Sequence, residues 1–457
     1  MGRDEVYAEQ EPSWAQRHRL GQMAVDAAAG TYRSSHPSTT LRVSGPLDVP
    51  ALERAWYRLQ SAHHVLRCGF DPESRRWRLD RPAAPAGMHL VRAPSGPSGS
   101  GGTPRSAGPA GDEEARLLVE LEDAPFDLEH GPLARLVLIE SGTDHLFALV
   151  TDHLVSDLWS LHVLMRDLTA FYRLELGLPA DPPAGASLPF PEHVRRQNAH
   201  LESEAGRATV DRLAHSLRHV GPVPELRYEG FTGVATAGYD DPGLLRTRIP
   251  RDLADALAAG ARASRMSKWN WIHAAVHHAL YALGDQPAVG TTMVTANREA
   301  AAVRRTVGFL SGRVVVATER TAAGDPRTFL DHFNRAAMRA IDVSASVPWG
   351  RIIARMRPES FGAPSSVPYL SFNPQPASMN RLLDDSGFAH CESRPLALPG
   401  FTLDAAVAVL PVEGPDGISV TVHHRTDWYP ARAVERLWER VEGTLRDWVR
   451  ALGAERP

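Results

Sequence analysis

The sequence predicts a two-domain protein that mixes helix and sheet, an α/β (α+β) fold. The chain has 457 residues, which is long for a single hydrophobic core. Both halves combine segments of helical period with segments of strand period, in similar proportion. A stretch rich in Pro and Gly, "LGLPADPPAGASLPFPEH", separates the halves. We therefore expect an N-terminal domain over residues 1–180 and a C-terminal domain over residues 181–457.

Composition excludes several classes of protein. Hydrophobic residues make up 43% of the chain and charged residues 23%, and the formal net charge is -4. No basic run suggests a nucleic-acid partner. The N-terminus lacks the apolar core of a secretory signal, and no apolar run approaches the roughly 18 residues that a membrane span needs. Cys68 and Cys391 lie far apart, which argues against a disulfide framework or zinc site. We expect a cytoplasmic, monomeric protein with neither a nucleic-acid nor a membrane partner.

The N-terminal half reads as an alternation of helix and strand. Asp48 and Pro50 are typical of a helix start, and Leu52, Trp56 and Leu59 then recur at helical spacing. The rest of this half is predicted to hold a short strand near residue 77, a flexible Gly/Ser/Pro loop over 94–112, a hairpin formed by "LARLVLIE" and "HLFALVTDH", and an apolar helix that ends at residue 177.

The C-terminal half follows the same pattern. Two helices are predicted near 251–264 and 267–283, a third over "PRTFLDHFNRAAMRAI" and a last one over "PARAVERLWERVEGTLRDWVRAL". Strands are predicted at "AVGTTMVTANRE", "SGRVVVATE", "VPYLSFN", "TLDAAVAVL" and "ISVTVHH".

His153 and Asp157 occupy the joint between the second hairpin strand and the helix that follows. A neutral imidazole can take a proton from an amine or hydroxyl nucleophile and return it to a leaving group. The end of a strand offers such a ring a rigid anchor. Asp157 is placed to cap the first turn of the helix, where the helix dipole favours its negative charge. A buried Asp157 also needs a cation to satisfy its remaining lone pairs.

The spacing His-x-x-x-Asp alone does not identify a site. With 20 histidines in the chain, about one chance match is expected. A second match does occur, at His423 and Asp427, again between a strand and a helix. Spacing cannot choose between the two pairs.

The surrounding segments resemble the condensation domains of nonribosomal peptide synthetases. Their signature reads HHxxxDG, commonly followed by Trp and Ser, and residues 152–160 here read "DHLVSDLWS". The resemblance extends, in order, from about residue 10 to about residue 450. It covers "GPLDVPALERAWYRLQSAHHVLRCGF", "APFDLEHGPLARLVLI", "VGTTMVTANRE", "TVGFLSGRVVV", "VPYLSFNPQP" and "VTVHHRTDWYPARAVERLWERV".

The resemblance implies a fold, a site and a reaction. The fold is a V of two chloramphenicol acetyltransferase-like lobes with a tunnel between them. His153 is implied as the tunnel histidine rather than His423, and Asp157 as a mainly structural carboxylate that pairs with an arginine, for which Arg67 is the matching candidate. Further positions follow the family: Asp152 and Asn373 in supporting roles, and Ser156, Leu158 and Ser311 along the substrate tunnel.

Three departures from the family pattern bear on activity. Asp152 replaces the first histidine of the signature, Leu158 replaces its glycine, and Gly312 stands where the latch segment tends to carry Asn. Asp152 either contacts the imidazole of His153 and raises its pKa, or faces away and bonds backbone or solvent, as alternation along a strand favours. Leu158 either narrows one tunnel mouth or joins the buried stripe of its helix.

The reaction implied by the resemblance is acyl transfer. A free-standing condensation enzyme would join an acyl or aminoacyl thioester, carried on the phosphopantetheine arm of a carrier protein, to an amine or hydroxyl acceptor, with no metal and no bound cofactor. An acyl-enzyme at Ser156 is not supported, since no Gly-x-Ser-x-Gly turn surrounds it. Two alternatives stay open: a non-catalytic member that recruits another enzyme to carrier-bound intermediates, and an acyltransferase that uses coenzyme A thioesters.

Overall fold

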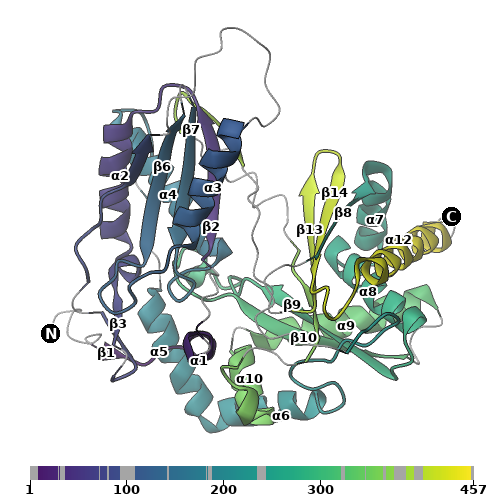
Figure 1. Ribbon diagram of the computed structural model, residues 1–457. Helices are drawn as coiled ribbons and strands as arrows, with labels where there is room; N and C mark the ends of the chain where they lie inside the picture. Colours follow the sequence, from purple (N-terminus) through teal and green to yellow (C-terminus); the bar gives the residue numbers. More distant parts are fainter. Residues whose placement is uncertain are drawn as a thin grey trace.

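The computed structural model consists of two lobes that stand side by side and meet at their base in a V (Figure 1). Each lobe is built on an open sheet with helices against it, which confirms the predicted fold class. The structure describes residues 9–28, 30, 36–71, 73–79, 82–92, 109–141, 144–181, 183, 188–233, 243–320, 325–344, 346–363, 367–374, 388–395 and 405–453.

The sheet of the N-terminal lobe has five strands in the order β12-β2-β7-β6-β5. The predicted hairpin is confirmed, since β6 and β7 pair antiparallel along their whole length. The strands span β2 (Ser38–Ser44), β5 (His89–Arg92), β6 (Ala134–Ser141), β7 (Asp144–Thr151) and β12 (Glu392–Pro395). A small separate sheet contains β1 (Glu9–Gln10), β3 (Gly69–Asp71) and β4 (Arg76–Arg78), the last at the strand predicted near residue 77.

Helices cover both faces of this sheet, which explains why its central strands read as continuous apolar runs. Leu136 and Leu138 of β6 belong to the buried cluster beneath α2 and α4. Val137 and Ile139 point to the opposite face and pack with Leu118 of α3. These helices span α2 (Val49–Ala62), α3 (Pro109–Asp123) and α4 (Leu158–Glu175).

Local signals fix the ends of α2 and α4 as predicted. The Asp48 carboxylate accepts a hydrogen bond from the Ala51 backbone N–H at 2.8 Å. At the far end of α4, Gly177 takes a φ of 69°, a left-handed conformation that ends the helix at little cost for glycine. The loop predicted over 94–112 lies outside the described residues up to 108, whereas 109–112 belong to α3.

The sheet of the C-terminal lobe has six strands in the order β10-β9-β11-β13-β14-β8. All five strands predicted in this half are present, and β8 is an addition at the edge. The strands span β8 (Gly243–Pro250), β9 (Ala288–Thr295), β10 (Gly312–Glu319), β11 (Leu370–Phe372), β13 (Val407–Gly414) and β14 (Gly417–His424).

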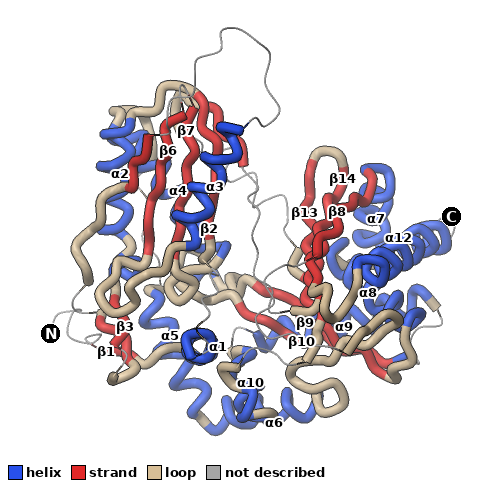
Figure 2. Tube along the Cα trace, in the orientation of Figure 1, coloured by secondary structure: helices blue, strands red, loops and turns tan. Residues whose placement is uncertain are grey.

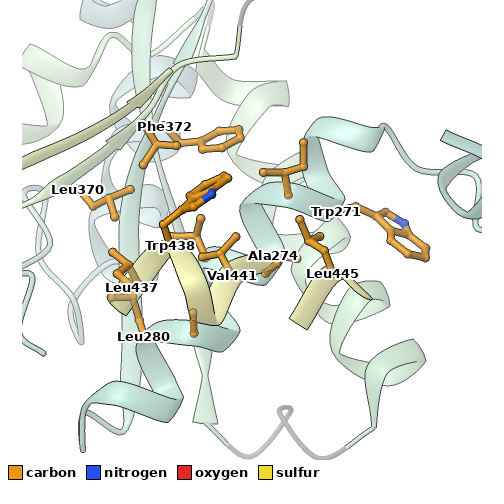
Figure 3. Close-up of a cluster of buried hydrophobic side chains, with 14 of the residues drawn as sticks. Trp271, Ala274, Leu280, Leu370, Phe372, Leu437, Trp438, Val441 and Leu445 are labelled. Carbon is orange, nitrogen blue, oxygen red and sulfur yellow. The ribbon is translucent and has the colours of Figure 1, made fainter. Parts of the chain in front are cut away.

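Four helices pack on one face of this sheet, and all four were predicted. They are α7 (Arg251–Ala263), α8 (Lys268–Leu283), α9 (Pro326–Ser344) and α12 (Ala431–Gly453). Trp438 and Val441 of α12 share one buried cluster with Ala274 of α8 and Phe372 of β11 (Figure 3). None of the helices in the described part of the chain combines the length and apolar character needed to cross a membrane.

Within the described ranges, four further helices, none of them predicted, lie at the base where the lobes meet (Figure 2). They are α1 (Trp14–Ala28), α5 (Phe190–Glu202), α6 (Glu204–Ser216) and α10 (Trp349–Met356). Helix α1, from the N-terminal half, packs against α10, from the C-terminal half.

A segment of the C-terminal half completes the sheet of the N-terminal lobe. Strand β12 pairs antiparallel with β2 at the edge of that sheet. Phe388, just before β12, is buried against Phe147 and Tyr172, with ring centroids 5.1 and 5.5 Å away. The two lobes are therefore joined by this crossing segment as well as by the helices at the base.

Candidate active site

The candidate site is built where β7 ends and α4 begins. Strand β7 ends at Thr151 and α4 starts at Leu158, so His153 lies in the intervening turn as predicted. The Asp157 carboxylate accepts a hydrogen bond from the Ser160 backbone N–H at 2.8 Å, which confirms its predicted role as the cap of α4.

The ring of His153 has a fixed orientation and a defined tautomer. Its Nδ1 lies 2.8 Å from the carbonyl oxygen of Ser156. Since a carbonyl only accepts, Nδ1 carries the proton, and in the neutral ring Nε2 keeps a lone pair. Burial lowers the pKa of His153, although the Ser156 carbonyl opposes that shift. The ring is therefore neutral near pH 7, with Nε2 as its basic atom.

Phe309, from the C-terminal lobe, packs against the ring of His153. The two ring centroids are 4.2 Å apart with an interplanar angle of 37°. This contact places a side chain of each lobe at the candidate site and excludes water from one side of the imidazole.

The Asp152 carboxylate contacts groups other than the imidazole of His153. Its carboxylate accepts from the Leu154 backbone N–H at 2.8 Å and lies 3.7 Å from Nδ1 of His36. Burial raises the pKa of Asp152 and, with Arg135 and Arg19 nearby, lowers the pKa of His36 to about 3. Of the two interpretations of Asp152, the structure favours the one in which its carboxylate accepts a hydrogen bond from the backbone rather than contacting the imidazole of His153. The neighbour His36 had no signal in the sequence.

The partner of Asp157 is Arg298, so the predicted pairing with Arg67 is wrong. Nη2 of Arg298 lies 3.2 Å from both carboxylate oxygens, and both side chains are almost fully buried. Arg67 instead donates to the carbonyl oxygens of Gln60 at 3.0 Å and Ala83 at 2.8 Å, within the N-terminal lobe. Asp157 thus pairs with the C-terminal half, whereas the guanidinium of Arg67 bonds to the N-terminal lobe.

The Asp157 carboxylate also holds the backbone of the C-terminal lobe. It accepts from the backbone N–H groups of Leu310 at 3.0 Å and Ser311 at 2.7 Å. These residues directly follow Phe309. The Asp157 carboxylate therefore holds the backbone directly after Phe309, the residue whose ring packs on His153.

Neighbouring contacts extend this link along α4. The Ser160 hydroxyl donates to the Gly308 carbonyl at 2.9 Å and accepts from the Gly308 N–H at 3.1 Å. Trp159 donates through Nε1 to the Arg304 carbonyl at 2.8 Å. A Cβ on Gly308 would lie 2.2 Å from the ring of Phe190, so only glycine fits between α4 and α5.

A second buried carboxylate repeats the arrangement ten residues along α4. Asp167 lies 3.0 Å from Nε2 of His63 and 2.8 Å from Nη2 of Arg305. His63 belongs to the N-terminal lobe and Arg305 to the C-terminal half. His63 is thus a partner of Asp167 and not a second base near His153.

Other residues implied by the resemblance occupy different surroundings. Ser156 is buried and its hydroxyl pairs with that of Thr151. Leu158 is 37% exposed, so it does not join the buried stripe of α4. The backbone N–H of Asn373 donates to the Val409 carbonyl at 2.9 Å. The tunnel roles of Ser156, Leu158 and Ser311, and the supporting role of Asn373, stay predictions.

The second His-x-x-x-Asp pair does not reproduce the arrangement. His423 lies within β14, opposite Ala408 of β13. Asp427 pairs with Arg425, two residues away, with its carboxylate oxygens 2.6 and 3.0 Å from the guanidinium. It lies before Ala431, where α12 begins, and is not its cap.

A sequence model of the condensation domain matches residues 28–451, nearly the whole chain and both lobes. The chain belongs to the condensation domain family. Among curated proteins, this condensation domain is similar to chondramide synthase cmdD of Chondromyces crocatus, with 26% identity over 97% of the chain and 11% of that protein. It is also similar to phosphinothricin tripeptide synthetase PhsB of Streptomyces viridochromogenes, with 28% identity over 70% of the chain and 26% of that protein. The chain thus spans only a small part of these relatives.

Solved structures show the same fold at low identity. The X-domain in its complex with OxyB from teicoplanin biosynthesis matches with a TM-score of 0.77 and 18% identity, over 98% of the chain and 94% of that domain. The first condensation domain of the CDA synthetase matches with a TM-score of 0.71 and 18% identity, over 97% of both chains. These likenesses establish the two-lobed fold of the condensation domain and nothing finer.

Proposed function

We propose that this condensation domain catalyses acyl transfer from a thioester to an amine or hydroxyl, forming an amide or an ester. The donor is an acyl or aminoacyl group on the phosphopantetheine arm of a carrier protein. One observation carries the proposal: the Ser156 carbonyl fixes the proton of His153 on Nδ1 at 2.8 Å, leaving Nε2 as a neutral base. Membership of the family and the similarity to peptide synthetases support the substrate class.

The reaction needs one proton transfer in each direction. As the acceptor nitrogen or oxygen bonds to the thioester carbonyl carbon, Nε2 of His153 takes the proton of the acceptor. When the tetrahedral species collapses, the carbon–sulfur bond breaks, and the imidazolium returns the proton to the departing thiolate. The lowered pKa of His153 keeps the ring neutral before the first step and favours release of the proton in the second.

The test compares His153→Ala with His423→Ala, which removes the histidine of the second His-x-x-x-Asp pair. Each variant is assayed with carrier-bound and coenzyme A-bound acyl donors, and with amine and hydroxyl acceptors. We expect His153→Ala to lose about two to four orders of magnitude in rate with the carrier-bound donor. His423→Ala is expected to keep the wild-type rate. A folded His153→Ala variant as fast as wild type contradicts the proposal. Turnover of the coenzyme A-bound donor and not of the carrier-bound donor contradicts the proposed role of a carrier protein as the donor's carrier.

A second candidate function is recruitment of another enzyme to a carrier-bound intermediate. The similarity to an X-domain solved in complex with OxyB supports it, together with Asp152 in place of the first signature histidine. Calorimetric titration with acyl-carrier proteins separates the two functions. Binding without turnover of any donor and acceptor pair favours recruitment, whereas turnover that depends on His153 favours catalysis.

A further inference from the structure

We propose that Gln16, at the start of α1, is a positioning residue that fixes the turn carrying His153; this rests on the proposed function. Its side-chain Nε2 donates to the carbonyl oxygen of Leu154 at 2.7 Å, across 138 residues of sequence. Leu154 directly follows His153, and both Gln16 and Leu154 are almost fully buried. The bond therefore joins α1 to the peptide next to the catalytic imidazole.

The orientation of the Gln16 amide follows from its other hydrogen bonds. The Ser13 backbone N–H donates to Oε1 of Gln16 at 2.9 Å, and the Gln16 backbone N–H donates to the Ser13 hydroxyl at 3.1 Å. This reciprocal pair is a capping box at the start of α1. Because Oε1 is occupied by a donor, Nε2 is the atom that faces Leu154, and a flipped amide would lose both contacts.

Helix α1 is itself anchored in the C-terminal half. The Gly362 backbone N–H donates to Nδ1 of His18 at 2.9 Å. A Cβ on Gly21 would lie 2.6 Å from the Cα of Gly362, so the two backbones touch. Gln16 thus projects from a helix that cannot shift without repacking the base of the V.

At the start of the turn, the Asp152 backbone N–H donates to the Leu133 carbonyl at 2.9 Å, whereas the middle of the turn, residues 153–155, is held from outside by the Gln16 bond. Leu154 N–H donates to the Asp152 carboxylate, Val155 N–H donates to the Asp152 carbonyl at 3.1 Å, and His153 donates to the Ser156 carbonyl. These bonds shape the turn, and the Gln16 bond ties it to α1. A displacement of a reacting group by about 1 Å costs about a hundredfold in rate.

The experiment compares Gln16→Leu with a matched control, Gln60→Leu. Gln60 is also fully buried, and its amide donates to the Ala86 carbonyl and accepts the Ala86 N–H, both at 2.9 Å, within the N-terminal lobe. Each substitution removes a buried amide that holds backbone. We expect similar losses in melting temperature. Only Gln16→Leu is expected to lower kcat, by about tenfold or more, with KM changed by less than about twofold.

Equal kcat values for the two variants overturn the proposal. If Gln16→Leu does not fold, Gln16→Glu replaces it, because a carboxylate still accepts the Ser13 N–H but cannot donate to Leu154. Its kcat is expected to fall relative to wild type as pH rises and the carboxyl ionises, and a kcat profile like that of wild type overturns the proposal.

Turnover by the wild type separates this proposal from the proposed function. A wild type that turns over no donor contradicts the proposed function alone, and nitrogen-15 spectra of the His153 ring then test Gln16 directly. The His153 signals are assigned by their loss in His153→Ala. We expect an Nδ1-protonated ring in wild type and in Gln60→Leu, and mixed tautomers in Gln16→Leu. An unchanged tautomer in Gln16→Leu overturns the role of Gln16.

Discussion

Replacing Asp157 by asparagine is expected to destabilise the protein by breaking the link between the lobes. The carboxylate is 1% exposed and pairs with Arg298, which is 2% exposed. Asparagine leaves the guanidinium without its countercharge and turns one acceptor atom into a donor that faces the N–H groups of Leu310 and Ser311. Breaking a buried ion pair from one side costs about 3–5 kcal/mol.

The loss is measured as a change in melting temperature. Unfolding entropy is about 2.1 cal/mol/K per residue, or about 1 kcal/mol/K for this chain, so Asp157→Asn is expected to melt about 4 °C lower. Asp211→Asn is the control, because Asp211 and its partner Arg355 are 57% and 54% exposed. An exposed pair contributes about 0–1 kcal/mol, or at most about 1 °C here. Equal shifts in the two variants would refute the structural role of Asp157.

Further predictions concern packing and pH. Gly308→Ala pushes a Cβ into the ring of Phe190 and is expected to lower the free energy of unfolding by about 1–3 kcal/mol. Gly443→Ala, in the open middle of α12, is expected to raise it by about 1 kcal/mol. Thermal melts in which Gly308→Ala is the more stable of the two variants would contradict this. His277 is fully buried, and burial lowers its pKa to about 3. Because the unfolded chain takes up this proton near pH 6.5 and the folded protein only near pH 3, the contribution of neutral His277 to the free energy of unfolding is complete above about pH 6.5 and is lost as pH falls toward 3. Melts at about pH 7.5 and about pH 5 should show wild type losing about 2 kcal/mol more than His277→Gln, and equal losses would contradict the assignment.

Local signals in the sequence predicted the core of each lobe and the site turn. The apolar run of β7 and the cap at Asp157 lie within a few residues of His153, so their consequences could be worked out without the fold. The helices α2, α8 and α12 were predicted correctly for the same reason. The strand β12 was missed because it is only four residues long. The helices α5 and α6 were missed because they lie beside a Pro- and Gly-rich boundary.

Partners from distant parts of the chain were not predictable. Asp157 lies 141 residues from Arg298, and nothing local distinguishes that arginine from Arg67 in a chain rich in arginine. The Ser-x-x-Gln pattern of Ser13 and Gln16 could have indicated the start of a helix, although not its bond to Leu154. Which residues meet across the base of the V depends on how the two lobes pack together.

The pH dependence of kcat/KM shows whether neutral His153 acts as the base. Wild type is expected to lose activity as pH falls, with an apparent pKa below about 6.5, since burial lowers the pKa of this ring. His153→Ala should lose both the rate and this acidic limb, while His423→Ala keeps both. An acidic limb that persists unchanged in His153→Ala would show that His153 is not the base.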